Sequence, residues 1–339
     1  MTGRTPVIDV HSHVLPKPLV EAIAARPREH DIEVVRDAQG AVHRFKRSDG
    51  HQTPIPAEFH DAGAKVAGMD RKGIDISVLS TTPFVFFYWL PADRALAAAK
   101  VTNDGIAQMV AAHPTRLRGM ATLPMQDADA AIAELERCVR EHGFRALEVG
   151  CTVQDLQLSE PRFRPILKRA AELKVVLFAH PHFVGGVRDQ LECWYLANLI
   201  GHPLDTVLMA SHLMFSGTLD ELPDLKIILA HGGGYLPYQI GRLAHGHECR
   251  TETKAQSKTS PLELLRRFWC DALTHDAMAL KYLVDRVGAD RVVIGTDAPY
   301  DMGEENPLGM LEQLTGLTNQ QRDLIHGLNA LELLGEGQA

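Results

Sequence analysis

Eight apolar β runs, each followed by a helical pattern, constrain the fold of this chain more than any other feature. The runs end near residues 13, 80, 123, 150, 180, 231, 271 and 297. Residues 175–180 are apolar at almost every position, as parallel strands buried on both faces should be. Eight strands that alternate with helices over 339 residues predict an α/β fold, a (β/α)8 TIM barrel.

A doubly wound sheet is the alternative, but it usually has fewer β/α units and a Gly-x-Gly-x-x-Gly turn after its first strand. No such turn follows residues 7–13, and no linker rich in Gly, Ser or Pro divides the chain. We therefore expect one domain over residues 1–339. Residues 29–60 differ in character, because apolar alternation on both sides of residues 38–40 predicts a small β-hairpin. We expect this segment to be an insertion after strand 1 that lies over the active-site face.

Composition excludes several classes of function. A net charge of −8 argues against binding nucleic acid or an anionic membrane surface. The chain has no apolar run of 18 residues and no basic-then-apolar signal region at its N-terminus. Its five cysteines are scattered and form no Cys-x-x-Cys, which is typical of free thiols in a reducing cytoplasm. The 17 histidines are unusual and suggest metal chemistry.

Five polar residues close apolar strands: His11, His13, His180, His231 and Asp297. Strand side chains at i and i+2 share a face, so His11 and His13 can reach one point. Taken singly, each residue has an ordinary structural explanation, such as a hydrogen-bonded strand end or a turn. Together they fall at the barrel face where active sites are built. Three histidines and one aspartate suit one zinc ion with a position open for water.

Two further acidic residues stand at or near strand ends. Asp271 also ends a strand, where a local role with His275 or the backbone is as reasonable as a catalytic one. Glu148, rather than a lysine that could be carboxylated, stands near the end of strand four, which favours one metal over two.

Several segments resemble the amidohydrolase superfamily, and within it the zinc-dependent decarboxylase branch that acts on 2-amino-3-carboxymuconate-6-semialdehyde. The matching segments are His11-Ser12-His13, Ala179-His180-Pro181, Ala230-His231-Gly232-Gly233-Gly234, Gly295-Thr296-Asp297-x-Pro299, residues 79–89, 122–126 and 271–276. The resemblance covers nearly the whole chain and is weakest over residues 29–60. It implies that His11, His13, His180 and Asp297 bind the metal, and that His231 acts as acid and base beside a metal-bound water. It also lets Asp297 hold or shuttle a proton.

The resemblance further implies substrate-binding residues. Arg47 matches a carboxylate-binding arginine, and Arg44 is close enough in sequence to be confused with it. Arg242 matches an arginine that reaches the site of a partner subunit, which implies a working homodimer. Trp194 matches a tryptophan that gates the site. Without the resemblance, the two matched arginines read as solvated surface residues, and Trp194 reads as a core or dimer contact.

The chain departs from the family pattern on the substrate side. His182 and Phe183 replace a Trp-Asp pair, and Ala298-Pro299-Tyr300 replaces Tyr-Pro-Phe. His182 is therefore a candidate donor to a substrate oxygen.

We expect metal-dependent, non-oxidative decarboxylation of an unsaturated carboxylic acid: the semialdehyde, a related ring-cleavage product or a hydroxybenzoate. A hydrolase acting on a C–C, lactone or amide bond is the alternative, and an inactive binding barrel is a third. The resemblance implies one Zn²⁺ per chain, although three histidines and one aspartate also bind Mn²⁺, Co²⁺ or Fe²⁺.

Overall fold

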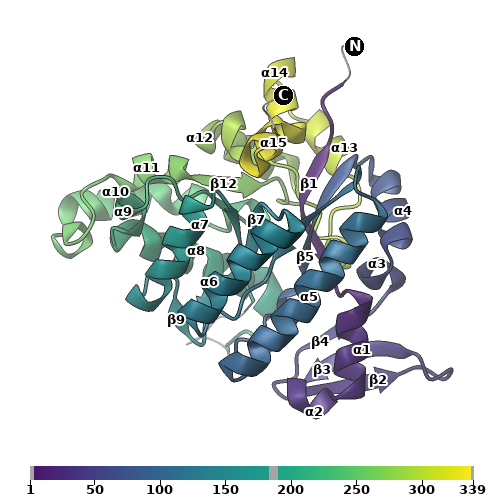
Figure 1. Cartoon of the computed structure of the whole chain (residues 1–339). Helices are drawn as coiled ribbons and strands as arrows, with labels where there is room; N and C mark the ends of the chain where they lie inside the picture. Colours follow the sequence, from purple (N-terminus) through teal and green to yellow (C-terminus); the bar gives the residue numbers. More distant parts are fainter. Residues whose placement is uncertain (1–3, 183–189, 337–339) are drawn as a thin grey trace.

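A computed structural model describes residues 4–182 and 190–336 and has the predicted barrel (Figure 1). The eight strands pair in parallel in the order β1-β5-β6-β7-β10-β11-β12-β13. Their bounds are β1 Ile8–Val14, β5 Ile76–Thr81, β6 Leu117–Ala121, β7 Ala146–Gly150, β10 Val176–His180, β11 Ile227–Leu229, β12 Phe268–Asp271 and β13 Val292–Val293. Backbone bonds between β1 and the stretch after β13 join the two ends, such as Val10 N to Ile294 O at 3.0 Å. The sheet is therefore nearly closed.

Helices follow each strand and cover the outside of the sheet (Figure 1). The helices that follow the eight strands are α4 (Ala62–Lys72), α5 (Ala92–Ala112), α6 (Ala128–Arg137), α7 (Arg164–Glu172), α8 (His202–Phe215), α10 (Leu236–Cys249), α12 (Ala277–Val287), and α14 (Asn319–Asp323) with α15 (Asn329–Leu334). The short helices α9 (Thr218–Glu221), α11 (Pro261–Leu264) and α13 (Pro307–Glu312) lie in the connections. In the described ranges, no helix is both long enough and apolar enough to span a lipid bilayer.

The barrel interior is filled by alternate strand side chains, among them Val10, Val78 and Phe178. Leu333 and Leu334 of α15 belong to the same cluster. Strand β1 has one extra residue relative to β5. Asp9 pairs with Ser77 and Ser12 pairs with Leu79, so three steps along β1 match two steps along β5. Such a bulge bends the strand and re-aims its side chains. Val10 and His11 therefore both point inward, where the His11 ring lies 4.8 Å from that of Phe178.

The last barrel strand is shorter than the sequence predicts. Residues 291–297 were expected to form it, but regular pairing is limited to Val292–Val293. Beyond it the chain stays against β1, with Asp297 N 2.8 Å from His11 O. Asp297 has a left-handed backbone (φ 57°), which is incompatible with an extended strand. Gly295 permits this close course, since a Cβ there would lie 2.9 Å from Cβ of His11.

The segment between β1 and α4 forms a small subdomain (Figure 1). It contains α1 (Lys17–Ala25), α2 (Pro27–His30), α3 (Ala57–His60) and an antiparallel sheet of β2 (Ile32–Arg36), β3 (Val42–Arg47) and β4 (Gln52–Pro54). The predicted hairpin corresponds to β2 and β3, and β4 adds a third strand. A separate apolar cluster holds this segment, with Phe45 and Phe59 fully buried. The turn from β3 to β4 is therefore attached to a packed apolar core.

A second small hairpin pairs β8 (Thr152–Val153) with β9 (Leu156–Gln157) just after β7.

Candidate metal centre and active site

Three histidines and one aspartate converge at the C-terminal mouth of the barrel. One ligand atom from each of His11, His13, His180 and Asp297 lies within 4.8 Å of the others. His11 and His13 come from β1, His180 ends β10, and Asp297 follows β13. The sequence predicted this set, and the barrel brings the four side chains together.

Hydrogen bonds orient the three imidazoles alike. Each uses Nδ1 to contact an oxygen: Asp271 Oδ2 for His11 at 2.6 Å, Thr81 O for His13 at 3.0 Å, and Pro181 O for His180 at 2.7 Å. A carbonyl or carboxylate oxygen accepts, so Nδ1 carries the proton and Nε2 keeps its lone pair. All three Nε2 atoms therefore face the site as acceptors, the usual arrangement of metal-binding histidines.

The donor set fits a divalent cation. Nε2 of His11 and Nε2 of His13 lie 3.2 Å apart, close enough for one cation to bind both nitrogens. Nε2 of His180 is buried and has no hydrogen-bond partner among the described residues. Burial holds the pKa of His180 well below its usual value, so its ring is neutral. Burial opposes ionisation of Asp297, but His11 and His13 outweigh it and keep its pKa well below the ordinary range.

Asp271, at the end of β12, holds His11 and the turn after β11 in place through hydrogen bonds. Its carboxylate accepts from His11 Nδ1 and from three backbone amides: His231 N at 3.0 Å, Gly232 N at 2.8 Å and Leu273 N at 3.2 Å. Of the local and catalytic roles left open by the sequence, the contacts support a structural one that links His11 to the turn carrying His231. His275 is not part of this network among the described contacts.

His231 stands beside the ligand cluster. Its Nε2 lies 3.7 Å from Asp297 Oδ2, and its ring centre is 5.1 Å from those of His11 and His180. Both His231 and Asp297 have left-handed backbones (φ 56° and 57°), a conformation that few non-glycine residues adopt. His231 is therefore next to Asp297 but is not one of the four residues of the cluster.

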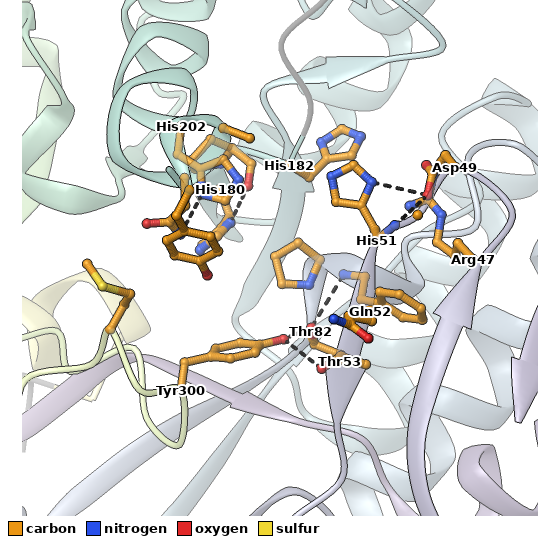
Figure 2. Close-up of a pocket in the computed structure, with 18 of the residues that line it drawn as sticks. Arg47, Asp49, His51, Gln52, Thr53, Thr82, His180, His182, His202 and Tyr300 are labelled. Carbon is orange, nitrogen blue, oxygen red and sulfur yellow. Dashed lines mark hydrogen bonds and ion pairs between the residues drawn. The ribbon is translucent and has the colours of Figure 1, made fainter. Parts of the chain in front are cut away.

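A cavity of about 670 Å³ opens above the cluster and is lined by His180 and Asp297 together with residues of the β3–β4 turn (Figure 2). Arg47 lines it and Arg44 does not. The Arg47 guanidinium lies 2.6 Å from Asp49 and over the Trp89 ring at 3.9 Å. Arg44 instead donates to Gln52 at 2.9 Å. Of the two arginines, Arg47 is therefore the one that faces the cavity.

Two residues that mark the departures from the family pattern also line the cavity. His182 packs edge-on against the rings of Phe86 and Tyr88, and burial lowers the pKa of its imidazole to about 3. Tyr300 donates or accepts through its hydroxyl with Thr82 and lies 5.6 Å, ring to ring, from His13 (Figure 2). Phe183 lies outside the described residues.

Arg242 and Trp194 lie away from the cavity of their own chain. Arg242 is exposed on α10, and Trp194 is 85% exposed before the start of α8. Neither lines the cavity, whereas Tyr195 does. Their predicted contacts with substrate remain predictions that require a partner subunit or a movement of this segment.

Sequence reasoning missed His202 and Asn198, which also line the cavity. Asn198 lies in a π-helical turn (Ala197–Gly201) and His202 begins α8, so no strand-end signal marked them. The count of 17 histidines was the sole hint.

The barrel and the buried three-histidine, one-aspartate cluster at its mouth define a metal-dependent TIM-barrel enzyme. Residues 8–335 match the family model described as Amidohydrolase, and the chain belongs to that family. It is 36% identical to a 2-amino-3-carboxymuconate-6-semialdehyde decarboxylase of Dictyostelium discoideum over 83% of this chain and 78% of the relative. It is 32% identical to a gamma-resorcylate decarboxylase of Polaromonas sp. JS666 over 70% of this chain and 76% of the relative.

Solved structures agree with this assignment. The dihydroxybenzoic acid decarboxylase of Polaromonas sp. JS666, solved with bound manganese and 2-nitroresorcinol, superposes with a TM-score of 0.81 at 26% identity, over 99% of this chain and 98% of that one. The fold of 5-carboxyvanillate decarboxylase LigW from Sphingomonas paucimobilis is also similar, with a TM-score of 0.83 at 24% identity, over 98% and 99% of the two chains. The expected barrel and superfamily are confirmed.

Proposed function

We propose that this protein is a metal-dependent decarboxylase that releases carbon dioxide without oxidation from an unsaturated or aromatic carboxylic acid. The observation that carries the proposal is the position of His231, 3.7 Å from Asp297 Oδ2 at the edge of the ligand cluster. The two relatives described above are named as decarboxylases of 2-amino-3-carboxymuconate-6-semialdehyde and of gamma-resorcylate. These two compounds define the substrate class to test.

His11, His13, His180 and Asp297 would hold the metal, which would supply positive charge to bind an anionic substrate and to lower the pKa of a bound water. The residues of the chain then move the proton. His231 delivers it to the carbon that bears the carboxylate, and that carbon becomes tetrahedral. The bond to the carboxylate breaks next, its electron pair returns to the unsaturated system, and carbon dioxide leaves. Asp297 faces His231 and can pass the proton on.

Carboxylate recognition is the role we assign to Arg47, with His182 as a neutral donor to a second oxygen of the substrate. Both line the cavity (Figure 2). A guanidinium binds a carboxylate through two parallel hydrogen bonds. Asp49 already engages Arg47 at 2.6 Å, so binding requires the substrate to share or displace this partner.

We assign zinc to the site, on the three-histidine, one-aspartate donor set. The manganese in the Polaromonas structure makes Mn²⁺ the metal against which this assignment has to be tested.

A homodimer is part of the proposal. Large apolar side chains are exposed on and near α8, α10 and α12, including Trp194, Tyr238 at 75% and Met278 at 82%. Arg242 lies on the same helix as Tyr238. A second copy seated on this surface would cover the apolar side chains and bring Arg242 to the partner's cavity. The free cysteines, among the described residues, accord with a cytoplasmic location.

Mixing two inactive variants tests the role of Arg242. If it acts across the dimer, an equal mixture of Arg242→Ala and His231→Gln chains recovers about a quarter of the wild-type activity, since half the dimers are mixed and one of their two sites is intact. No recovery after subunit exchange, with dimers demonstrated by light scattering, refutes action across the interface.

The first experiment is elemental analysis combined with a carbon dioxide release assay on 2-amino-3-carboxymuconate-6-semialdehyde and 2,6-dihydroxybenzoate. We expect about one zinc per chain, as a single site of this type requires, and release that His231→Gln abolishes. Hydrolysis of esters or vinylogous ketones without carbon dioxide release would favour the hydrolase and refute decarboxylation.

A further inference from the structure

His202 occupies the wall of the cavity beside His231. It begins α8 and lines the cavity together with His180 (Figure 2). Its ring is nearly parallel to that of His231, with an angle of 27° between the planes and 6.3 Å between the centres. The ring of His180 lies 6.4 Å away. A second imidazole therefore flanks the proton donor, outside the metal ligand set.

A close backbone contact places His202 there. Gly234, in the turn after β11, lies so near the first turn of α8 that a Cβ on it would be 2.4 Å from Pro203 O. Its backbone is also left-handed (φ 60°), which favours glycine. The turn that carries His231 and the helix start that carries His202 are thus held against each other. Their relative position is set by backbone packing and not by a flexible loop.

Asn198 determines which ring nitrogen of His202 donates. It lies one turn before His202, and its amide Nδ2 is 3.4 Å from His202 Nδ1. The amide donates to Nδ1, so the proton of the neutral ring resides on Nε2. Burial, together with the nearby His231, lowers the pKa of His202 to about 3. The ring is therefore neutral at physiological pH, with one donor nitrogen available toward the cavity.

We propose that His202 is a specificity-determining residue that donates its Nε2–H to an oxygen on the carbon next to the one that loses carbon dioxide. This inference rests on the proposed function and narrows its substrates to acids with a hydroxyl, carbonyl or carboxylate oxygen at that position. His231 gives its proton to the carbon that bears the carboxylate, and His202 donates a hydrogen bond to the oxygen on the neighbouring carbon.

The chemistry gives this contact a purpose. In a substrate whose adjacent hydroxyl is ionised, an electron pair from that oxygen feeds the ring when the proton from His231 forms a bond to the ring carbon, and the C–O bond becomes a carbonyl. When the bond to the carboxylate breaks, its electron pair restores the ring, and carbon dioxide is released. A donor at the oxygen binds the ionised substrate and stabilises the negative charge that returns to this oxygen when the bond to the carboxylate breaks. The overall change consumes one proton and the carboxylate and yields carbon dioxide and the protonated carbon.

Three variants of one residue separate hydrogen bonding from packing. His202→Phe keeps a ring against His231 but removes both nitrogens. His202→Gln places an amide close to the position of Nε2 and can still donate there. His202→Asn places its amide near Nδ1, too short to reach the cavity, and is the matched control for the glutamine.

The test is binding to the metal-loaded protein, measured by isothermal titration calorimetry with 2-hydroxybenzoate, 4-hydroxybenzoate and benzoate. We expect His202→Phe and His202→Asn to weaken binding of 2-hydroxybenzoate about five- to tenfold, the effect of one lost hydrogen bond. His202→Gln should restore most of it. Binding of benzoate and 4-hydroxybenzoate should change less than about twofold, because neither has the adjacent oxygen.

Elemental analysis must show unchanged metal content in each variant. Equal losses for all three acids, no loss for 2-hydroxybenzoate, or no binding of 2-hydroxybenzoate to the wild type overturns the inference. The proposed function fails separately, if the wild type releases no carbon dioxide from any acid tested. A selective loss of 2-hydroxybenzoate binding in a protein without turnover would still support the contact.

Discussion

Replacing Asp271 with asparagine is expected to weaken metal binding and to destabilise the fold. Oδ2 accepts from His11 Nδ1 and His231 N, and Oδ1 accepts from Gly232 N and Leu273 N. Asparagine offers one oxygen in place of two. Whichever way its amide turns, two buried N–H groups then face an NH₂ group.

The magnitude follows from these contacts. Each buried donor left unpaired costs about 1–3 kcal/mol, so two cost about 2–6 kcal/mol, toward the lower end if the turn relaxes. Loss of the carboxylate that orients the His11 ring lowers metal affinity about 10- to 100-fold. The burial of Asp271 alone would raise its pKa, but the hydrogen bond and charge of His11 outweigh this and lower it. The native residue is therefore an anion, and the substitution removes a charge.

Urea unfolding of the metal-free protein measures the stability term, and chelator competition measures metal affinity. Asp276→Asn is the control, because Asp276 caps α12 by accepting from Ala279 N at 2.8 Å and asparagine caps about as well. Metal affinity within about threefold of the wild type in Asp271→Asn would refute the orienting role, since the expected loss is at least about tenfold.

His231→Gln is expected to lower kcat about 10²- to 10⁴-fold with unchanged metal content, measured by carbon dioxide release and elemental analysis. Between pH 6.5 and 5 the wild type should lose up to about 1.5 kcal/mol more stability than His182→Phe. The pKa of His182 is lowered to about 3, so over this interval the proton binds the unfolded chain and favours it. Urea unfolding at both pH values, with exposed His245→Phe as control, checks this, and equal losses contradict it. Gly295→Ala places a Cβ 2.9 Å from Cβ of His11 and should cost about 1–3 kcal/mol. If urea unfolding gives an unchanged free energy of unfolding, the chain after β13 can move away from β1 without cost.

The barrel and its four-residue cluster were predictable because their signals are local. Each parallel strand reads as an apolar run, and a polar residue that ends it is visible in a few letters, as in residues 175–180. The β/α topology then places all strand ends at one face. His11, His13, His180 and Asp297 needed no further information to be brought together.

Other features depend on contacts between segments far apart in sequence. The bulge that turns both Val10 and His11 inward is defined by the register with β5, and the short β13 by the close course of Gly295 beside β1. Neither the bulge nor the short strand is indicated by the residue pattern of its own segment. The hydrogen bonds of Asp271 likewise join β1, β11 and β12, which no local spacing reveals.

The sequence by itself determined the class of fold and the strand-end residues that gather at the barrel mouth, His11, His13, His180, His231 and Asp297, since periodicity and strand ends encode them. Tertiary structure alone decided which groups line the cavity. Arg47 rather than Arg44 lines the cavity because of how the β2–β4 sheet packs, and His202 reaches it because Gly234 admits the first turn of α8. Side chains on helices and loops acquire their neighbours through packing, and packing is a property of the whole chain.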